Sequence, residues 1–465
     1  MSIALESLAT CFQGLIPAQL FTCSLDGVPN AAYLSHVDYV DSTHVALSFQ
    51  FFNKSRRNIA ENPHALVLVP DPDSGQIWRL RLRFVRSETT GPLFERMRLR
   101  IEAIASYCGL KGIFKLRAAD VYEVRSVEAV EQDHGDGQYA GLLSRDDRRP
   151  VDPVFTMHAL QNLALRLHDA ESLEGLLDSI LVALDESFGF KHSMILMPTE
   201  VDGELVTIAT RGYPENGVGS ESRHGEGLAG LVAEARKPIR ISGLMRGILY
   251  ALAMHHQSSD PANVIIGRKI PLPGLASPES QLGIPLLVRG ELVGVLCLES
   301  EVPYRFHEED KQSIEVLGNF VAIAIQNMQL HERSAAETTG EAASQSDEAG
   351  ARVDAPLAGR HEVTYYQADE CVLVDGEYLI RSLPARILWK LLTMHRDTGR
   401  TEFTNRELRL DKSLNLPEWK DNLESRLLLL RRRLEQKCPT IRITPSGRGR
   451  FVLELCRDVA LSTRP

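Results

Sequence analysis

The sequence lacks any run of about 18 consecutive apolar residues, so we expect no transmembrane helix. Its first residues do not form a basic stretch followed by an apolar one, so no secretory signal peptide is expected. The seven cysteines are scattered and include no CxxC pair, which argues against a disulfide framework and against a zinc site. Together these absences predict a protein of the reducing cytoplasm.

Positive charge is scarce in most of the chain and concentrated near its end. The net charge is −10, yet residues 378–457 hold 18 Lys and Arg against 9 Asp and Glu. Because this segment has an excess of nine positive charges, the rest of the chain carries about −19. Such asymmetry predicts a nucleic-acid-binding end attached to a body that DNA would repel.

Two polar segments with little to bury divide the chain. Residues 131–153 are rich in Gly and Asp, and residues 332–360 are small, polar and acidic, as in a flexible tether. The expected domains are therefore 1–130, 154–331 and 361–457, in agreement with the rough number of domains that the length suggests.

The N-terminal segment is dominated by alternating apolar residues and turn signals. Turns at Asp26-Gly27 and Asp41-Ser42 separate strand-like runs, which predicts a small antiparallel barrel. After the third strand, QFFNKSRRNIAENP predicts a short helix with Ser55 as its N-cap and three cations beside its start. Exposed N–H groups and cations at a helix start suit a phosphate, but a solvated helix start is an equally good interpretation of these residues.

The pattern IPAQLFTCSLDGVPNAAYLSHVDYVDSTHVALSFQFFNKSRRNIAENPHALVLV resembles the pyridoxamine 5′-phosphate oxidase-like family of FMN-binding split barrels. The resemblance covers about residues 10–125. It implies a bound FMN, with haem or no cofactor as alternatives, because members of the superfamily differ in this respect. The residues that it implies for the flavin and its phosphate are Ser48, Phe49, Gln50, Lys54, Ser55 and Arg56.

The middle segment combines amphipathic helices with strands. GLAGLVAEARKPIRI, the hairpin IPLLVRGELVGVLCLES with its turn at Arg289-Gly290, and FHEEDKQSIEVLGNFVAIAIQN follow in an order that resembles a GAF domain. This resemblance implies an α/β sensory domain with a small-molecule effector in a pocket on one face of its sheet.

The last helix of the middle segment has apolar residues at alternating spacings of three and four. They are Ile314, Leu317, Val321, Ala324 and Met328. This spacing is typical of a helix that pairs with a second helix, and it predicts a homodimer. The alternative is that these residues pack on the sheet of their own domain.

The C-terminal segment, 361–457, predicts two helices, a longer basic helix and a basic hairpin. Thr404 followed by Glu407 forms a capping box at the start of the second helix. The third helix is expected over residues 420–437 and the hairpin over 441–455.

This order resembles the OmpR/PhoB-type winged helix-turn-helix, with LLLLRRRLEQ in its recognition helix and TPSGRGRFVL in its wing. The resemblance implies double-stranded DNA as the partner, with the helix in the major groove, where base edges can be distinguished. The exposed side chains expected to face the bases are Lys420, Asn422, Ser425 and Arg426. Those expected to reach phosphates are Arg431, Arg432, Arg433, Arg448 and Arg450.

The fold class is therefore expected to be multidomain α+β: a split β-barrel, a GAF domain and a winged helix-turn-helix. The favoured function is a cytoplasmic one-component transcriptional regulator in which the first two modules sense a small molecule or a redox signal. The alternative is a flavin- or haem-dependent oxidoreductase with regulatory attachments. No acid–base pair or nucleophile with supporting spacing favours that enzyme, so no catalytic residue is assigned.

Overall fold

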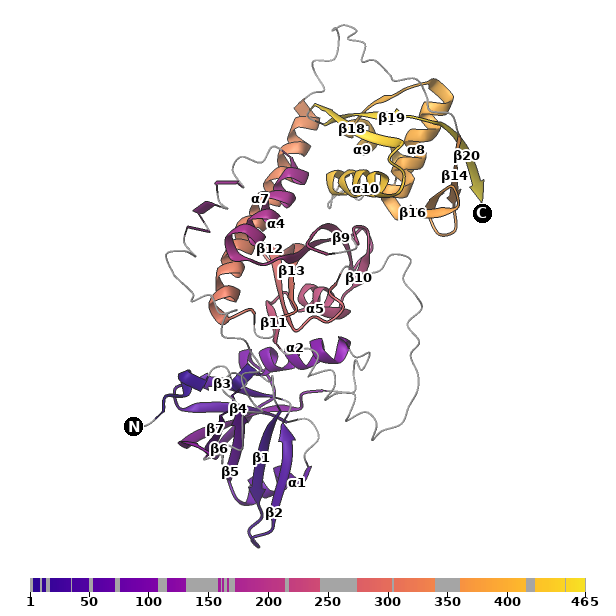
Figure 1. The fold of residues 1–465 in the computed structure, drawn as a ribbon. Helices are drawn as coiled ribbons and strands as arrows, with labels where there is room; N and C mark the ends of the chain where they lie inside the picture. Colours follow the sequence, from indigo (N-terminus) through magenta and orange to yellow (C-terminus); the bar gives the residue numbers. More distant parts are fainter. Residues whose placement is uncertain are drawn as a thin grey trace, which may run out of the picture.

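Three domains follow one another along the chain in the computed structural model, with the N-terminal domain at one end and the C-terminal domain at the other (Figure 1). The structure describes residues 3–8, 11–13, 17–34, 36–49, 53–71, 76–107, 115–130, 158–159, 161–162, 165–166, 172–213, 217–242, 274–302, 305–338, 360–414, 423–447 and 449–464. Among these, no helix is both long and apolar enough to span a membrane.

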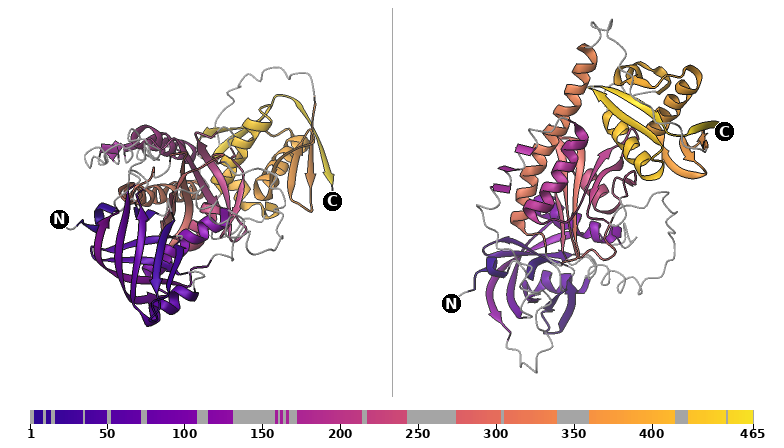
Figure 2. Two further views of the ribbon diagram at one scale, coloured as in Figure 1. Left: turned by 60° about the horizontal axis from the view of Figure 1, so that its bottom comes forward. Right: turned by 45° about the horizontal axis from the view of Figure 1, so that its top comes forward.

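The N-terminal domain is a seven-stranded antiparallel sheet in the order β2-β1-β5-β6-β7-β4-β3. Only two residues separate Leu34 at the end of β2 from Val37 at the start of β3, a link that spans about 11 Å at most. The two edges of the sheet therefore lie close together, and the sheet curls into a barrel (Figure 2). The strands are β1 (Ala18–Cys23), β2 (Pro29–Leu34), β3 (Val37–Asp41), β4 (His44–Phe49), β5 (His64–Pro70), β6 (Ile77–Glu88) and β7 (Ala118–Ala129).

The middle domain is built on a six-stranded antiparallel sheet in the order β10-β9-β8-β13-β12-β11. Helices α4 and α7 cover one face, and α5 lies on the other. The elements are α4 (Leu173–Phe188), β8 (His192–Pro198), β9 (Glu204–Arg211), β10 (Glu221–Arg223), α5 (Gly227–Ala235), β11 (Ile239–Ser242), β12 (Ser280–Val288), β13 (Glu291–Ser300) and α7 (Glu308–Thr338).

Local signals in the sequence set the boundaries of several of these elements. Ser172 caps α4 by accepting a hydrogen bond from the backbone of Gly175. The predicted turn between β12 and β13 is confirmed, with positive φ at both Arg289 and Gly290, as a tight hairpin requires. Helix α7 continues to Thr338, into the stretch that was predicted to be tether, because its Ala and Glu residues favour helix.

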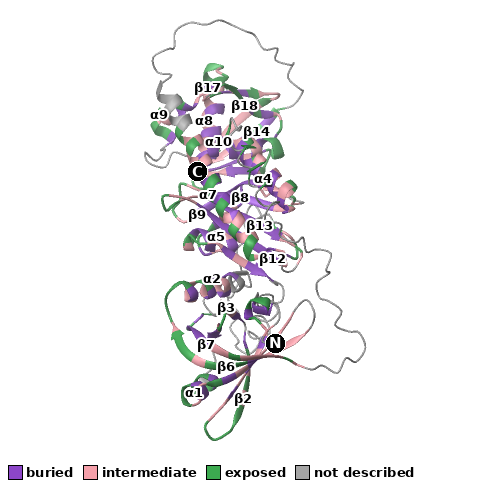
Figure 3. Ribbon diagram, turned by 90° about the vertical axis from the view of Figure 1, so that its left-hand side faces the viewer, coloured by how far each residue is buried: buried purple, intermediate pink, exposed green. Residues whose placement is uncertain are grey.

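Helix α2 (Pro92–Tyr107) joins the first two domains because its two faces belong to different cores. Met97 and Ile101 pack with residues of β4 and β7 in the barrel. Leu99 and Ala103 pack instead with residues of α5, β11 and neighbouring strands of the middle domain. Figure 3 shows α2 lying between the barrel and the middle sheet.

The described residues of the C-terminal domain form two sheets and three α-helices, with a short 3-10 helix at Lys412–Leu414. One sheet has the order β16-β15-β14-β20, with β14 and β20 parallel, and the other has the order β17-β19-β18. The elements are β14 (Arg360–Tyr366), β15 (Cys371–Val374), β16 (Glu377–Arg381), α8 (Ser382–Thr398), β17 (Glu402–Thr404), α9 (Asn405–Leu410), α10 (Leu423–Lys437), β18 (Ile441–Gly447), β19 (Arg450–Leu455) and β20 (Asp458–Arg464).

The predicted capping box of α9 is confirmed, because Thr404 and Glu407 exchange hydrogen bonds with each other's backbone. Strand β20 was not predicted from the sequence. A single buried cluster of apolar side chains runs from the middle sheet through α4 and α7 into α8 and α10. The middle and C-terminal domains therefore share a continuous core.

Candidate functional site

Exposed cations lie beside the first turn of helix α1 (Asn53–Glu61), immediately after β4. Lys54, Arg56 and Arg57 are all exposed. The first N–H groups of a helix have no intrahelical acceptor and attract anions. Since the helix begins at Asn53, Ser55 lies inside its first turn, and the prediction of Ser55 as N-cap was wrong.

Ser55 faces the barrel interior rather than these cations. Its side chain is buried, and Asn30 Nδ2 donates a hydrogen bond of 2.9 Å to its Oγ. Ser48 and Phe49, at the end of β4, are buried as well. The surface next to the helix start is therefore formed by Lys54 and Arg56, without the Ser55 hydroxyl.

The Arg56 guanidinium lies over the ring of Phe49, 4.4 Å from the ring centre. Asp120 is buried nearby in β7 and accepts a 2.5 Å hydrogen bond from Ser87. Burial raises the pKa of the Asp120 carboxyl, and Ser87 and Arg56 oppose this shift. The exposed cations at this helix start fit the phosphate end of a nucleotide cofactor by charge and by available donors.

A second concentration of charge lies where helix α10 packs against α4 and β9 of the middle domain. Arg426 is only 2% exposed, and its Nη2 donates a 2.8 Å hydrogen bond to the carbonyl of Pro198. Arg433 is 4% exposed and donates to the carbonyls of Leu379 and Val218. Burial lowers the pKa of both guanidinium groups.

The remaining α10 arginines meet carboxylates of helix α4. Arg432 forms a 2.7 Å ion pair with Asp178 and donates to the carbonyl of Ile208 at 3.0 Å. Arg431 lies 3.6 Å from Glu174, and Arg432 lies at the same distance from that carboxylate. The basic side of α10 is therefore covered by the middle domain.

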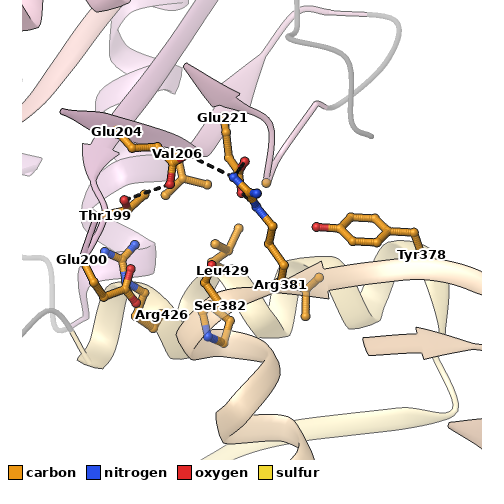
Figure 4. Close-up of a pocket in the computed structure, with 13 residues that line it drawn as sticks. Thr199, Glu200, Glu204, Val206, Glu221, Tyr378, Arg381, Ser382, Arg426 and Leu429 are labelled. Carbon is orange, nitrogen blue, oxygen red and sulfur yellow. Dashed lines mark hydrogen bonds and ion pairs between the residues drawn. The ribbon is translucent and has the colours of Figure 1, made fainter. Parts of the chain in front are cut away.

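Next to this contact, Arg381 of the C-terminal domain reaches two carboxylates of the middle sheet (Figure 4). It hydrogen-bonds Glu221 and lies 3.0 Å from Glu204. Burial, and then the neighbouring Glu221, raise the pKa of Glu204. A cavity of about 20 Å³ between these residues has room for about one water molecule.

The face of the middle sheet that carries α5 also has polar side chains at one end. Gln281 donates a 2.6 Å hydrogen bond to Glu299, and the backbone N–H of Leu275 donates to the other oxygen of that carboxylate at 3.0 Å. His192 is the cross-strand neighbour of Glu299. Gln281 and Glu299 are both buried. No group of three metal-ligating side chains gathers anywhere in the described part of the chain.

Residues 172–325 match the family model of the GAF domain. The middle domain is a GAF domain. This match covers about a third of the chain, from the N-cap of α4 to the middle of α7. It confirms the resemblance that the strand and helix order of this segment suggested.

Parts of the chain are similar to several solved structures. One is a GAF domain from a phosphoenolpyruvate-protein phosphotransferase of Coxiella burnetii, which is 22% identical in sequence. The match covers 39% of this chain and 98% of that chain, with a TM-score of 0.29. Free methionine-R-sulfoxide reductase from Neisseria meningitidis, in complex with its substrate, has 15% identity, covers 40% and 97%, and scores 0.30. An FMN-binding protein from Syntrophomonas wolfei subsp. wolfei has 16% identity, covers 28% and 90%, and scores 0.23. These scores are too low to support a functional conclusion. No curated protein matches the sequence.

The structure places the predicted DNA-binding residues very differently from one another. Arg450 is exposed in the β18–β19 hairpin, as expected. Ser425 and Arg426 are buried, so the prediction that they are exposed was wrong, and Arg433 is buried too. The physical reason is that the GAF domain covers this side of α10. Lys420, Asn422 and Arg448, like Gln50 in the barrel, lie outside the described residues.

Sequence reasoning missed the residues that meet across the GAF and C-terminal domains. Glu174 and Asp178 are four residues apart on α4, a spacing that places two carboxylates on one helix face. That spacing was a usable signal. The sequence gives no comparable signal for the pairing of Arg381 with Glu204 and Glu221, because these residues are separated by about 160 positions or more.

Proposed function

We propose that this protein is a cytoplasmic transcriptional regulator in which the GAF domain, together with an FMN-binding split barrel, controls DNA binding by a C-terminal winged helix-turn-helix. The observation that carries the proposal is the basic C-terminal domain, with four arginines on α10 and an exposed Arg450 on the β18–β19 hairpin. Three helices followed by a basic hairpin are the arrangement that a winged helix uses to bind a groove and the adjacent backbone.

The test is duplex DNA binding by the full-length protein, measured by fluorescence anisotropy over a range of salt concentrations. Replacing Arg450 by alanine should weaken binding to all sequences alike and reduce the slope of log K against log salt by about one unit. Arg406→Ala is the matched control, since it removes an exposed arginine of the same domain from outside the hairpin. Full affinity and slope in Arg450→Ala would remove the hairpin from the proposal.

The N-terminal barrel is proposed to hold FMN, with Lys54 and Arg56 at its phosphate and Phe49 beneath Arg56. When bound, the flavin would supply redox chemistry, and the residues of the chain would bind and orient it.

Arg56→Ala should weaken FMN binding by about tenfold or more, and so lower the fraction of purified protein that carries FMN, because a charge-assisted contact to phosphate contributes about 1.5–3 kcal/mol. The flavin absorbance of purified protein, with release of FMN on denaturation, measures that fraction. Arg125→Ala, an exposed arginine elsewhere in the barrel that pairs with Glu123, should leave it unchanged. Equal flavin content in both variants would exclude Arg56 from the phosphate site.

A homodimer through α7 is also proposed, but on a different face from the predicted one. Ile314, Leu317 and Val321 are buried against their own sheet. A second stripe on α7 is exposed and repeats at alternating spacings of four and three: Val316, Phe320, Ile323, Asn327 and Leu330. A single Asn within such a stripe favours two-stranded pairing. A monomer in sedimentation equilibrium at micromolar concentration would contradict it.

The effector of the GAF domain is proposed to be a small molecule bound beside Gln281 and Glu299, on the face of the sheet opposite α4 and α7. A buried carboxylate with an amide neighbour favours ligands that carry hydrogen-bond donors. The residues expected to cover a pocket of this domain are 242–270, and all of them after residue 242 lie outside the described part of the chain. Calorimetric titration with candidate metabolites, compared between the protein and its Glu299→Gln variant, tests this assignment.

A further inference from the structure

Helix α10 is not available to DNA in this structure. To contact base edges, a helix must enter the major groove with its polar side free. Ser425 and Arg426 are at most 2% exposed, and the GAF domain covers the side of α10 that carries its arginines. DNA and the GAF domain would therefore compete for one surface of one helix.

The GAF domain presents carboxylates where a nucleic acid would present phosphates. Asp178 pairs with Arg432, Glu174 lies near both Arg431 and Arg432, and Glu200 lies 3.4 Å from Arg426 Nε. These acidic groups come from α4 and from the turn after β8. The charge pattern of the GAF surface thus complements the basic helix.

The contact is electrostatically incomplete, which favours its release. Arg426 Nε is buried and has no hydrogen-bond partner, because its approach to Glu200 lacks hydrogen-bond geometry. Arg433 donates hydrogen bonds to two backbone carbonyls and to Gln436. Among the described residues, no carboxylate forms an ion pair with it. Buried cations with incomplete partners are costly, so a polyanion that satisfies them can compete.

Release of α10 from the GAF domain would not require its own domain to unfold. The helix also packs on α8, β16 and β18 of the C-terminal domain. Leu427, Leu430 and Leu434 belong to its buried side. The same helix can thus remain folded on one side while its arginine side changes partner.

We infer that the docking of α10 on the GAF domain is an autoinhibitory contact, in which Glu174, Asp178 and Glu200 hold the arginines of α10 away from DNA. This inference rests on the proposed DNA-binding function. It adds that the sensory domain regulates DNA binding by covering the helix itself. An effector that favours the undocked arrangement of the GAF domain would therefore activate binding.

The experiment compares three full-length proteins: wild type, the double variant Glu174→Gln/Asp178→Asn, and the control Asp185→Asn/Glu186→Gln. The control neutralises two carboxylates of the same helix that pair with Arg211 and Arg166 instead of α10. Any effect of net charge alone is therefore matched. Hydrogen exchange of the α10 amides reports docking, and anisotropy of a fluorescein-labelled duplex reports DNA binding.

We expect faster exchange in α10 and about tenfold tighter DNA binding for the Glu174/Asp178 variant only, since each lost ion pair shifts the equilibrium by a few-fold. Unchanged exchange, or faster exchange with DNA affinity equal to that of the control, would overturn the autoinhibitory contact while leaving DNA binding in place. Faster exchange with no DNA binding by any of the three proteins would instead overturn the proposed function, and the inhibitory role with it.

Discussion

Replacing Gly230 by alanine should lower the free energy of unfolding of the GAF domain by about 3 kcal/mol. Gly230 lies in helix α5, where alanine is normally the better helix former. Here an added Cβ would overlap the carbonyl oxygen of Arg223, a backbone atom that no rotamer change can move. The loss should appear as a lower midpoint urea concentration for unfolding of the GAF domain, followed by hydrogen exchange of the backbone amides of α5 and β12.

Gly175 provides the matched control because it is also a glycine in the first half of a helix of this domain. An added Cβ there meets only the Ser172 Oγ, at 3.4 Å. Gly175→Ala should be neutral or stabilising by up to about 1 kcal/mol. Equal stability of the two variants would show that α5 does not approach the Arg223 carbonyl as the structure describes.

Replacing Arg381 by alanine should weaken the contact between the GAF and C-terminal domains by about 2 kcal/mol. The variant leaves the Glu204 and Glu221 carboxylates facing each other without their shared cation. Arg381 is about one-third exposed, so the cost stays below that of a fully buried pair. Hydrogen exchange of α10 amides in the full-length chain measures the loss, and Arg386→Ala, which breaks a pair within the C-terminal domain, is the control.

The free energy of domain contact that is lost in Arg381→Ala should become smaller as the pH falls from neutrality toward about pH 5. Burial and Glu221 already raise the pKa of Glu204 in the docked protein, and loss of Arg381 raises it further. A carboxyl with a raised pKa takes up a proton more readily in the docked state, so protonation favours docking. A deficit that grows toward low pH would mean that Glu204 is not the group left unpaired.

Local structure followed closely from local residues. The Thr404–Glu407 capping box, the Arg289-Gly290 turn and the strands of the barrel were readable because caps and tight turns depend on a few neighbouring residues. The pairing of β14 with β20 was not, since a parallel partner almost 100 residues away leaves no short-range signal.

The candidate site was harder to predict for a physical reason. The arginines of α10 were predicted to bind DNA, and their exposure was inferred from their charge alone. Arg426 and Arg433 are buried because another domain supplies acceptors for them. A sequence pattern reports which side of a helix is polar, but it does not report whether solvent, DNA or protein satisfies that side.

Helix α2 limits how this protein can be divided or recombined. Leu99 and Ala103 belong to the N-terminal domain by sequence but to the GAF core by contact. An exchange of modules within residues 131–153 would remove these side chains and leave Leu228, Leu231 and Ile239 without their cover. Gene rearrangements that retain function should therefore keep the barrel and the GAF domain together, whatever happens to the C-terminal domain.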